Sequence, residues 1–132
     1  MELRNKKNKE PKLTLKEFFE KIETITNPNF DLDYTGTFKD SVKLKFKSNK
    51  DLNLLFAAIE ILVKNGVLPS SYNPHQLVGF KKKNNQRVME CHIEPDWLLV
   101  WTQNDEVLTL LLVDTGTHSE LFNSNKLRKT LK

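Results

Sequence analysis

Three histidines and one aspartate are the residues of this chain whose types suit acid–base chemistry. They are His75 in "YNPHQL", His92 and Asp96 in "CHIEPDW", and His118 in "TGTHSE". An imidazole exchanges protons near neutral pH, so two histidines can supply a general base and a general acid. Taken singly, each histidine also has an ordinary structural explanation, as a loop, exposed strand or helix-start residue.

His118 has the most informative surroundings of the three histidines. Thr117 and Glu120 match a capping box, which predicts that a helix begins at His118. The start of a helix favours a neutral imidazole, and its free backbone N–H groups can hold a phosphate. The sequence therefore predicts a histidine and an anion site at the same place.

Helices are predicted in the first half of the chain. "LTLKEFFEKIETIT" has apolar residues at helical spacing and a capping box, which indicates an amphipathic helix over 15–25. "FKDSVKLKFKSNK" indicates a basic helix, and "DLNLLFAAIEILVKNG" a second one, with Asp51 as its N-cap and Gly66 as its stop. The short connection between these two helices predicts an antiparallel pair.

Strands are predicted mainly in the second half. Alternating apolar residues in "NFDLDY" indicate a short strand, and "RVMECHIE", "WLLVWTQ" and "EVLTLLLVDTG" indicate an antiparallel meander. In the first strand of the meander Cys91 and His92 point to opposite faces. The last two strands are apolar on both faces, so helices must cover one side and the other side must be partly covered. The predicted fold class is α+β, an antiparallel sheet packed against an N-terminal helical pair with an extra N-terminal helix.

Length and composition restrict the class of protein. The chain has 132 residues, 38% of them hydrophobic, as expected for one domain. Neither a signal peptide nor a membrane span is indicated, because the apolar runs are short. The single cysteine, Cys91, forms no internal disulfide. We expect a cytoplasmic protein without a membrane partner.

The formal net charge of +4 is unevenly distributed. Residues 38–87 sum to +7, and residues 88–122 sum to −7. A basic segment of this kind attracts the phosphates of a nucleic acid. It is also what a solvated helix face looks like, and the charge alone favours that simpler interpretation.

An ordered set of motifs resembles the YafQ branch of the RelE-like bacterial toxins. The set comprises "YTGTFKDSVKL", "KDLNLL", "LPSSYNPHQLVG", "CHIEPDWLLVW" and "TGTHSELF", and it spans roughly residues 30–122. The resemblance implies a RelE-like ribonuclease fold and the toxin of a type II toxin–antitoxin system. Such toxins are cytoplasmic endoribonucleases that need no cofactor, cut messenger RNA in the ribosomal A site and are silenced by a cognate antitoxin.

The resemblance also assigns residue roles. The catalytic positions it implies are His75, His92, Asp96 and His118. Trp97 and Phe122 fall on positions that shape the site or contact RNA, although Trp97 is equally a core residue by type and Phe122 an anchor for the C-terminus. Metal-independent cleavage would use a base on the ribose 2′-OH and an acid at the departing 5′-oxygen. His118 would take one role, His92 or His75 the other, and Asp96 would orient a histidine.

Two departures from the family pattern are expected to lower the activity. Asp114 stands where an arginine commonly precedes "TGTH", and a carboxylate there would oppose the charge of the reacting phosphate. Met89 stands where relatives have an arginine before the histidine, and Arg87 lies two residues earlier. Compensating RNA contacts are expected from the nearby cations, namely Lys81, Lys82, Lys83 and Arg87. Two alternatives stay open: an impaired relative that only binds antitoxin or RNA, and a metal site of three histidines and a carboxylate.

The predicted organisation has three parts. Residues 1–29 form a basic tail and an accessory amphipathic helix, 30–122 the toxin domain, and 123–132 a basic tail. The accessory helix either covers exposed core or places an acidic face over the basic region.

Overall fold

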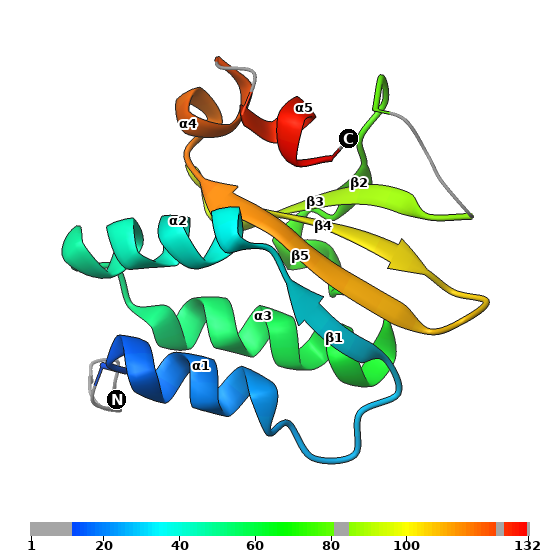
Figure 1. Cartoon of the computed structure of the whole chain (residues 1–132), viewed down its shortest axis with the longest axis horizontal. Coiled ribbons are helices and arrows are strands. Elements are labelled where there is room, and N and C mark those ends of the chain that lie inside the picture. The colour runs from blue at the N-terminus through cyan, green and yellow to red at the C-terminus, as the bar shows by residue number, and fades with distance from the viewer. Residues whose placement is uncertain (1–11, 81–84, 124–125, 132) are drawn as a thin grey trace.

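A five-stranded sheet organises the computed structural model, which describes residues 12–80, 85–123 and 126–131. The strand order is β1-β5-β4-β3-β2. Three long helices lie on one face, and two short helices lie beyond the other face at one end (Figure 1). The helices are α1 (Leu15–Glu23), α2 (Gly36–Lys47), α3 (Leu52–Asn65), α4 (His118–Phe122) and α5 (Lys126–Thr130), with a 3₁₀ turn at Ser70–Tyr72. The strands are β1 (Asp31–Tyr34), β2 (His75–Gln76), β3 (Arg87–Glu94), β4 (Trp97–Asn104) and β5 (Thr109–Gly116).

The helix ends follow the predicted capping signals. The capping box at Thr14 and Glu17 is present, and the side chain of Asp51 caps α3 through the backbone N–H of Asn53. Gly66 ends α3 with a φ of 73°, a left-handed conformation that glycine adopts without strain. Helix α2 begins at Gly36, earlier than predicted, because Thr35 caps it. Helices α2 and α3 run in opposite directions, as predicted (Figure 1).

The predicted meander is confirmed, but the sheet is mixed. Strands β3, β4 and β5 pair antiparallel, whereas β1 pairs parallel with β5, from Asp31 opposite Thr109 to Tyr34 opposite Leu112. The predicted antiparallel meander did not include this parallel pair at the β1 edge. The strands of a parallel pair are joined by a long connection and not by a tight turn, so no turn motif in the sequence predicts their pairing. Strand β2, two residues long, also escaped prediction.

Two separate cores lie on the two faces of the sheet. The helix-covered core includes Phe18 and Ile22 of α1, so the accessory helix shares its packing with the rest of the fold. The second core is smaller and contains Val88, Leu98, Val100, Val113, Leu121 and Leu127. Cys91 faces the helix-covered core, where burial raises the pKa of its thiol to about 12.

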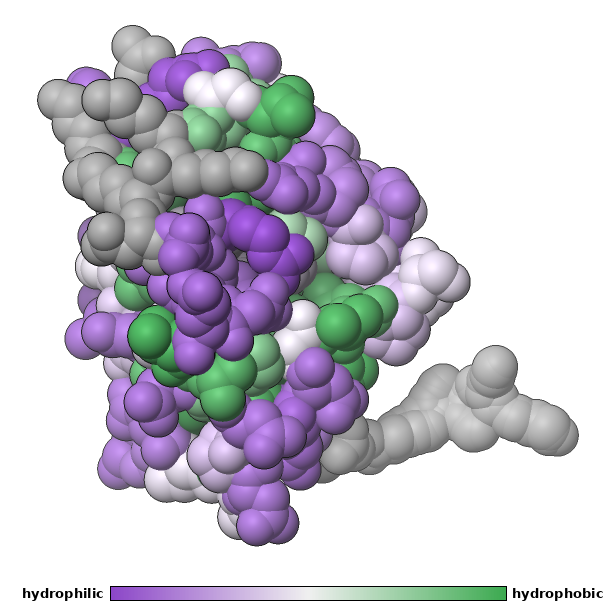
Figure 2. Space-filling view, turned by 90° about the vertical axis from the view of Figure 1, so that its right-hand side faces the viewer, coloured by the Kyte–Doolittle hydropathy of each residue, from purple (hydrophilic) through white to green (hydrophobic). Residues whose placement is uncertain are grey.

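The remaining surface is mostly polar. Figure 2 shows one side of the molecule, on which hydrophobic side chains appear as separate patches among hydrophilic ones. Among the described residues, no helix is long and apolar enough to cross a membrane.

Candidate active site

His118 lies where strand β5 turns into helix α4. The predicted capping box is present: Thr117 Oγ1 accepts from the Glu120 N–H at 3.1 Å, and Glu120 Oε1 accepts from the Thr117 N–H at 2.8 Å. This reciprocal pair sets the start of α4 and leaves the His118 side chain 55% exposed. The sequence predicted free backbone N–H groups for a phosphate here, but the N–H of His118 is not free, because it donates to Asp96 Oδ1 at 2.9 Å.

Asp96 holds His118 at two points. Asp96 lies in the turn between β3 and β4. Its Oδ1 accepts a hydrogen bond from the backbone N–H of His118 and also lies 2.7 Å from His118 Nδ1. The His118 N–H, and then the ring, lower the pKa of the Asp96 carboxyl below its usual 3.8. A carboxylate at Nδ1 places a proton on that nitrogen and leaves Nε2 to exchange protons with a substrate.

His92 and Phe122 complete an exposed cluster with His118. The ring centroids of His92 and His118 are 5.7 Å apart, and those of His118 and Phe122 are 6.4 Å apart. The Nδ1 atom of His92 lies 3.3 Å from the carbonyl oxygen of Pro95, which steadies its ring over the same turn. The structure thus brings two imidazoles, one carboxylate and one aromatic ring together at the surface.

His75 lies beside this cluster and has partners of its own. Its Nε2 is 3.0 Å from Glu90 Oε1, and its Nδ1 is 3.1 Å from the carbonyl oxygen of Asn73. His75 pairs with Glu90 across β2 and β3, and Glu90 shares its face of β3 with His92. His75 also lines a hollow of about 410 Å³ to which Phe122 contributes. It therefore borders the same region without a described contact to His92 or His118.

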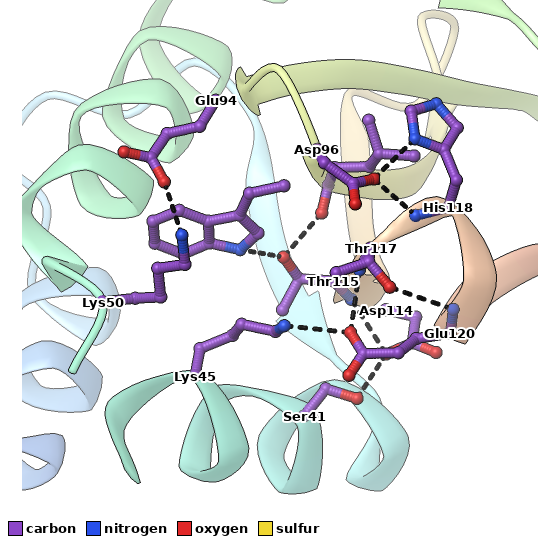
Figure 3. A network of polar contacts seen from close by, with 12 residues as sticks. Ser41, Lys45, Lys50, Glu94, Asp96, Asp114, Thr115, Thr117, His118 and Glu120 are labelled. Carbon is purple, nitrogen blue, oxygen red and sulfur yellow. Dashed lines mark hydrogen bonds and ion pairs between the residues drawn. The ribbon is translucent and has the colours of Figure 1, made fainter. Parts of the chain in front are cut away.

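Lys45 is a residue near the site that the sequence reasoning missed. Its side chain is 7% exposed, and its Nζ lies 2.9 Å from Glu120 Oε1, the atom that also caps Thr117 (Figure 3). The Thr117 N–H, and then Lys45, lower the pKa of the Glu120 carboxyl. A Cβ at Gly116 would lie 2.8 Å from Glu120 Oε1, so the glycine leaves room for this contact. We call the contact between Lys45, Glu120 and Thr117 the brace.

The brace has a weak signal in the sequence. Lys45 follows the buried positions of α2 at the spacing of one helix face, which groups it with core residues rather than with the exposed lysines. The buried residues of α2 are Phe38, Ser41, Val42 and Lys45. A lysine on the apolar face of a helix needs a partner, and Glu120 supplies it.

Trp97 lies in the helix-covered core and not at the surface. It has no exposed area, and its indole N–H donates to Thr115 Oγ1 at 2.9 Å. The Thr115 hydroxyl in turn donates to the carbonyl oxygen of Leu98 at 2.6 Å. Contact of Trp97 with RNA is incompatible with this burial, so Trp97 supports the site from beneath.

Arg87, one of the predicted cations, is not brought to the histidines. Arg87 starts β3, five residues before His92 and about 16 Å away at the rise of a strand. Its guanidinium pairs with Asp105 at 2.5 Å. The other predicted cations, Lys81, Lys82 and Lys83, lie outside the described residues.

Asp114 is buried beneath α2. It has no exposed area, and its Oδ1 accepts from the Ser41 hydroxyl at 2.5 Å and from the Thr115 N–H at 2.8 Å. A fully buried carboxylate makes no contact with a bound phosphate. The expected opposition between Asp114 and the substrate is therefore not a direct contact.

The described residues offer no ready metal site. Over 12–80, 85–123 and 126–131, no three His, Cys, Asp or Glu side chains are grouped closely enough to hold a metal ion.

The chain is similar to known toxins over most of its length. Residues 30–123 match a family model described as the bacterial toxin of a type II toxin–antitoxin system, YafQ. The mRNA interferase toxin YafQ of Escherichia coli K12 is 37% identical over 93 residues, which cover 70% of this chain and 95% of that protein.

Solved structures give the same result for the fold. The E. coli DinJ–YafQ toxin–antitoxin complex contains a chain with a TM-score of 0.61 and 36% identity, covering 71% of this chain and 98% of that one. The archaeal RelE–RelB complex of Pyrococcus horikoshii matches with a TM-score of 0.52 and 10% identity, over 67% of this chain and 94% of the other. The second match supports the RelE-like fold alone.

Proposed function

The chain belongs to the YafQ family of bacterial type II toxins, and from this premise we propose that it is an endoribonuclease that cuts messenger RNA on the ribosome. The E. coli relative is named an mRNA interferase toxin. The exposed cluster of His92, Asp96 and His118 supports the same chemistry in this chain, because it offers two proton-transfer groups and an orienting carboxylate at one surface.

The reaction requires two proton transfers and no metal. One imidazole takes the proton of the ribose 2′-OH, whose oxygen attacks the adjacent phosphorus. The other imidazole gives a proton to the departing 5′-oxygen, and the products are a 2′,3′-cyclic phosphate and a 5′-hydroxyl. Rings 5.7 Å apart at their centroids can flank one phosphodiester. His118, held by Asp96, takes one role and His92 the other, with His75 as the second candidate for that counterpart.

The contact of Asp96 with His118 is the observation that carries this proposal. Both the backbone and the ring of His118 are held by a carboxylate that is itself 65% exposed. The hydrogen bond to the backbone N–H satisfies a donor at the start of α4. The second contact, to the ring Nδ1, is exposed and contributes little to stability, so its evident use is to orient the ring. This orientation is what acid–base catalysis needs.

The experiment compares induced expression of the parent, His118→Ala and Ser119→Ala, followed by mapping of transcript 5′ ends. Ser119 lies next to His118 on α4 and serves as the matched control. We expect growth arrest and cut transcripts from the parent and from Ser119→Ala, and neither from His118→Ala. A His118→Ala variant as toxic as the parent would refute the assignment.

The proposed partner is a cognate antitoxin. The E. coli YafQ chain was solved in complex with DinJ, as a toxin–antitoxin pair. Co-expression of the neighbouring open reading frame should then prevent arrest by the parent. Translating ribosomes in the cytoplasm would present the message, so cutting should fall when translation is blocked.

The alternative of a relative that only binds is less well supported. Its main basis was Asp114, and the burial of that carboxylate beneath α2 removes a direct repulsion of substrate. Induced expression of the parent without growth arrest or transcript cutting would favour this alternative.

A further inference from the structure

A hollow opens next to the histidine cluster, between the segment 77–80, α4 and α5. Its volume is about 410 Å³, in the size range of small-molecule pockets. Two aromatic residues, Phe80 and Phe122, line it together with His75 and Arg128. Phe122 is shared with the cluster, since its ring also lies 6.4 Å from that of His118. The hollow and the proposed active site are therefore contiguous.

Helix α5 forms one wall of this hollow. The family match ends at residue 123, so α5 is an element that the family model does not include. Leu127 is 1% exposed in the second core and seats the helix. Arg128 fastens it to the opposite wall: its Nη1 donates to the Gly79 carbonyl at 3.0 Å, and its guanidinium lies 4.7 Å from the centre of the Phe80 ring.

The lining suits a nucleobase. Aromatic rings and the guanidinium plane of arginine are the groups on which unstacked RNA bases stack. Arg128 adds a positive charge beside a substrate whose backbone is negative. Val78, 89% exposed and on the rim, adds apolar surface that nothing in the described chain covers.

We propose that this hollow binds one base of the RNA substrate, next to the phosphodiester that is cut, with Phe80, Phe122 and Arg128 as its stacking surfaces. The proposal rests on the proposed function and extends it, because it makes an element outside the family match a determinant of where the message is cut. A base held there would place the adjoining phosphate toward His118, since Phe122 borders both.

The test compares two substitutions in the hollow with one control on α5 and one conservative variant of Phe80. Arg128→Gln removes the charged plane, and Phe80→Leu removes the ring while keeping an apolar side chain. Lys129→Gln removes a charge from the same helix without touching the hollow, and Phe80→Tyr keeps the ring. Each variant is induced, transcript 5′ ends are mapped, and the folded fraction is checked by thermal melting.

We expect the two hollow variants to cut RNA about tenfold less than the parent, which corresponds to the loss of one base–aromatic stack. They should also lose base preference at one position flanking the cut. The Lys129→Gln control should keep the parent's rate and preference, and Phe80→Tyr, which keeps an aromatic ring in the hollow, should lose less of both than Phe80→Leu. Reduced cutting with unchanged preference in Arg128→Gln and Phe80→Leu would overturn the subsite and leave α5 a packing role. Unchanged cutting with loss of antitoxin neutralisation would also overturn it, because the hollow would then seat protein. If the parent itself cut no RNA, the proposed function would fail first and the subsite with it.

Discussion

The two faces of the sheet are built for different purposes. The helix-covered face carries the large buried side chains, among them Phe18, Trp97 and Trp101, each with an exposed fraction of 1% or less. The opposite face has a smaller core, and next to it stand polar groups with exposed side chains, His75 and His118. One face therefore supplies most of the buried packing, while the other presents the imidazoles of the proposed active site.

The two faces meet at one end of the sheet. There the brace joins α2 to the start of α4, and Asp114 joins β5 to Ser41 of the same helix. Substitutions on the first face should change unfolding with little effect on chemistry. Substitutions on the second should do the reverse, and the brace should link the two.

Phe18→Ala should have the largest effect, and only on stability. The side chain is fully buried against α3, so its loss should lower the free energy of unfolding by about 3–5 kcal/mol. Denaturant unfolding measures this, with Phe122→Ala as the control, because Phe122 is 39% exposed. Equal losses from both variants would contradict the division between faces, and so would a small loss from Phe18→Ala.

Asp96→Asn should cost about 100-fold in RNA cutting, in the range expected of acid–base groups. The amide can still accept from the His118 backbone, but it removes the negative charge that orients and supports the ring. The measurement is the rate of transcript cutting per folded molecule. Asp105→Asn, the same change in the exposed turn of the next hairpin, should cut like the parent.

Lys45→Met should reduce cutting about tenfold and leave thermal stability little changed. The carboxylate of Glu120 stays hydrated without its partner because its side chain is 47% exposed, so little stability is lost, whereas the brace loses its cation. Lys45→Arg should recover most of the activity. In a double-mutant cycle with Glu120→Gln the losses should not add, because both residues belong to one network. Additive losses would show that Lys45 acts apart from Glu120.

The pH dependence should show the smallest effect. Contacts with His118 lower the pKa of Asp96 in the folded state, so their contribution is present above its usual value of 3.8 and is lost as the pH falls through the lowered value. Unfolding of the parent and Asp96→Asn between pH 3 and 7 tests this. The difference in free energy of unfolding between the parent and Asp96→Asn should be constant near neutrality and should shrink at the acid end. A difference that stays constant down to the lowest pH would be inconsistent with a charge-dependent contact.

Local signals in the sequence predicted the parts of the site that depend on neighbouring residues. The capping box at Thr117 and Glu120 and the two faces of β3 both follow from spacing alone. Contacts between distant segments did not. The parallel pairing of β1 with β5 and the contact of Lys45 with Glu120 both join segments that are far apart in the chain. No local sequence pattern predicts such contacts, because they depend on how the elements pack together.

Residue type alone was ambiguous where a side chain suits either surface or core. Trp97 fits both an RNA contact and a packing role, and only its place beneath the strand end decides for packing. Arg87 is only five residues from His92 in the sequence, but both lie on the extended strand β3, where each residue adds about 3.3 Å of distance. A cation close in the chain is therefore no guide to a cation close in space.

The chemistry of the cut ends tests the central claim most directly. Attack by the 2′-OH with proton transfer by His92 and His118 leaves a 5′-hydroxyl on the downstream fragment and a cyclic phosphate on the upstream one. Treating the mapped fragments with a 5′ kinase before ligation distinguishes these ends. The account predicts that downstream fragments become ligatable only after kinase treatment. Fragments that carry a 5′-phosphate without it would contradict attack by the ribose hydroxyl.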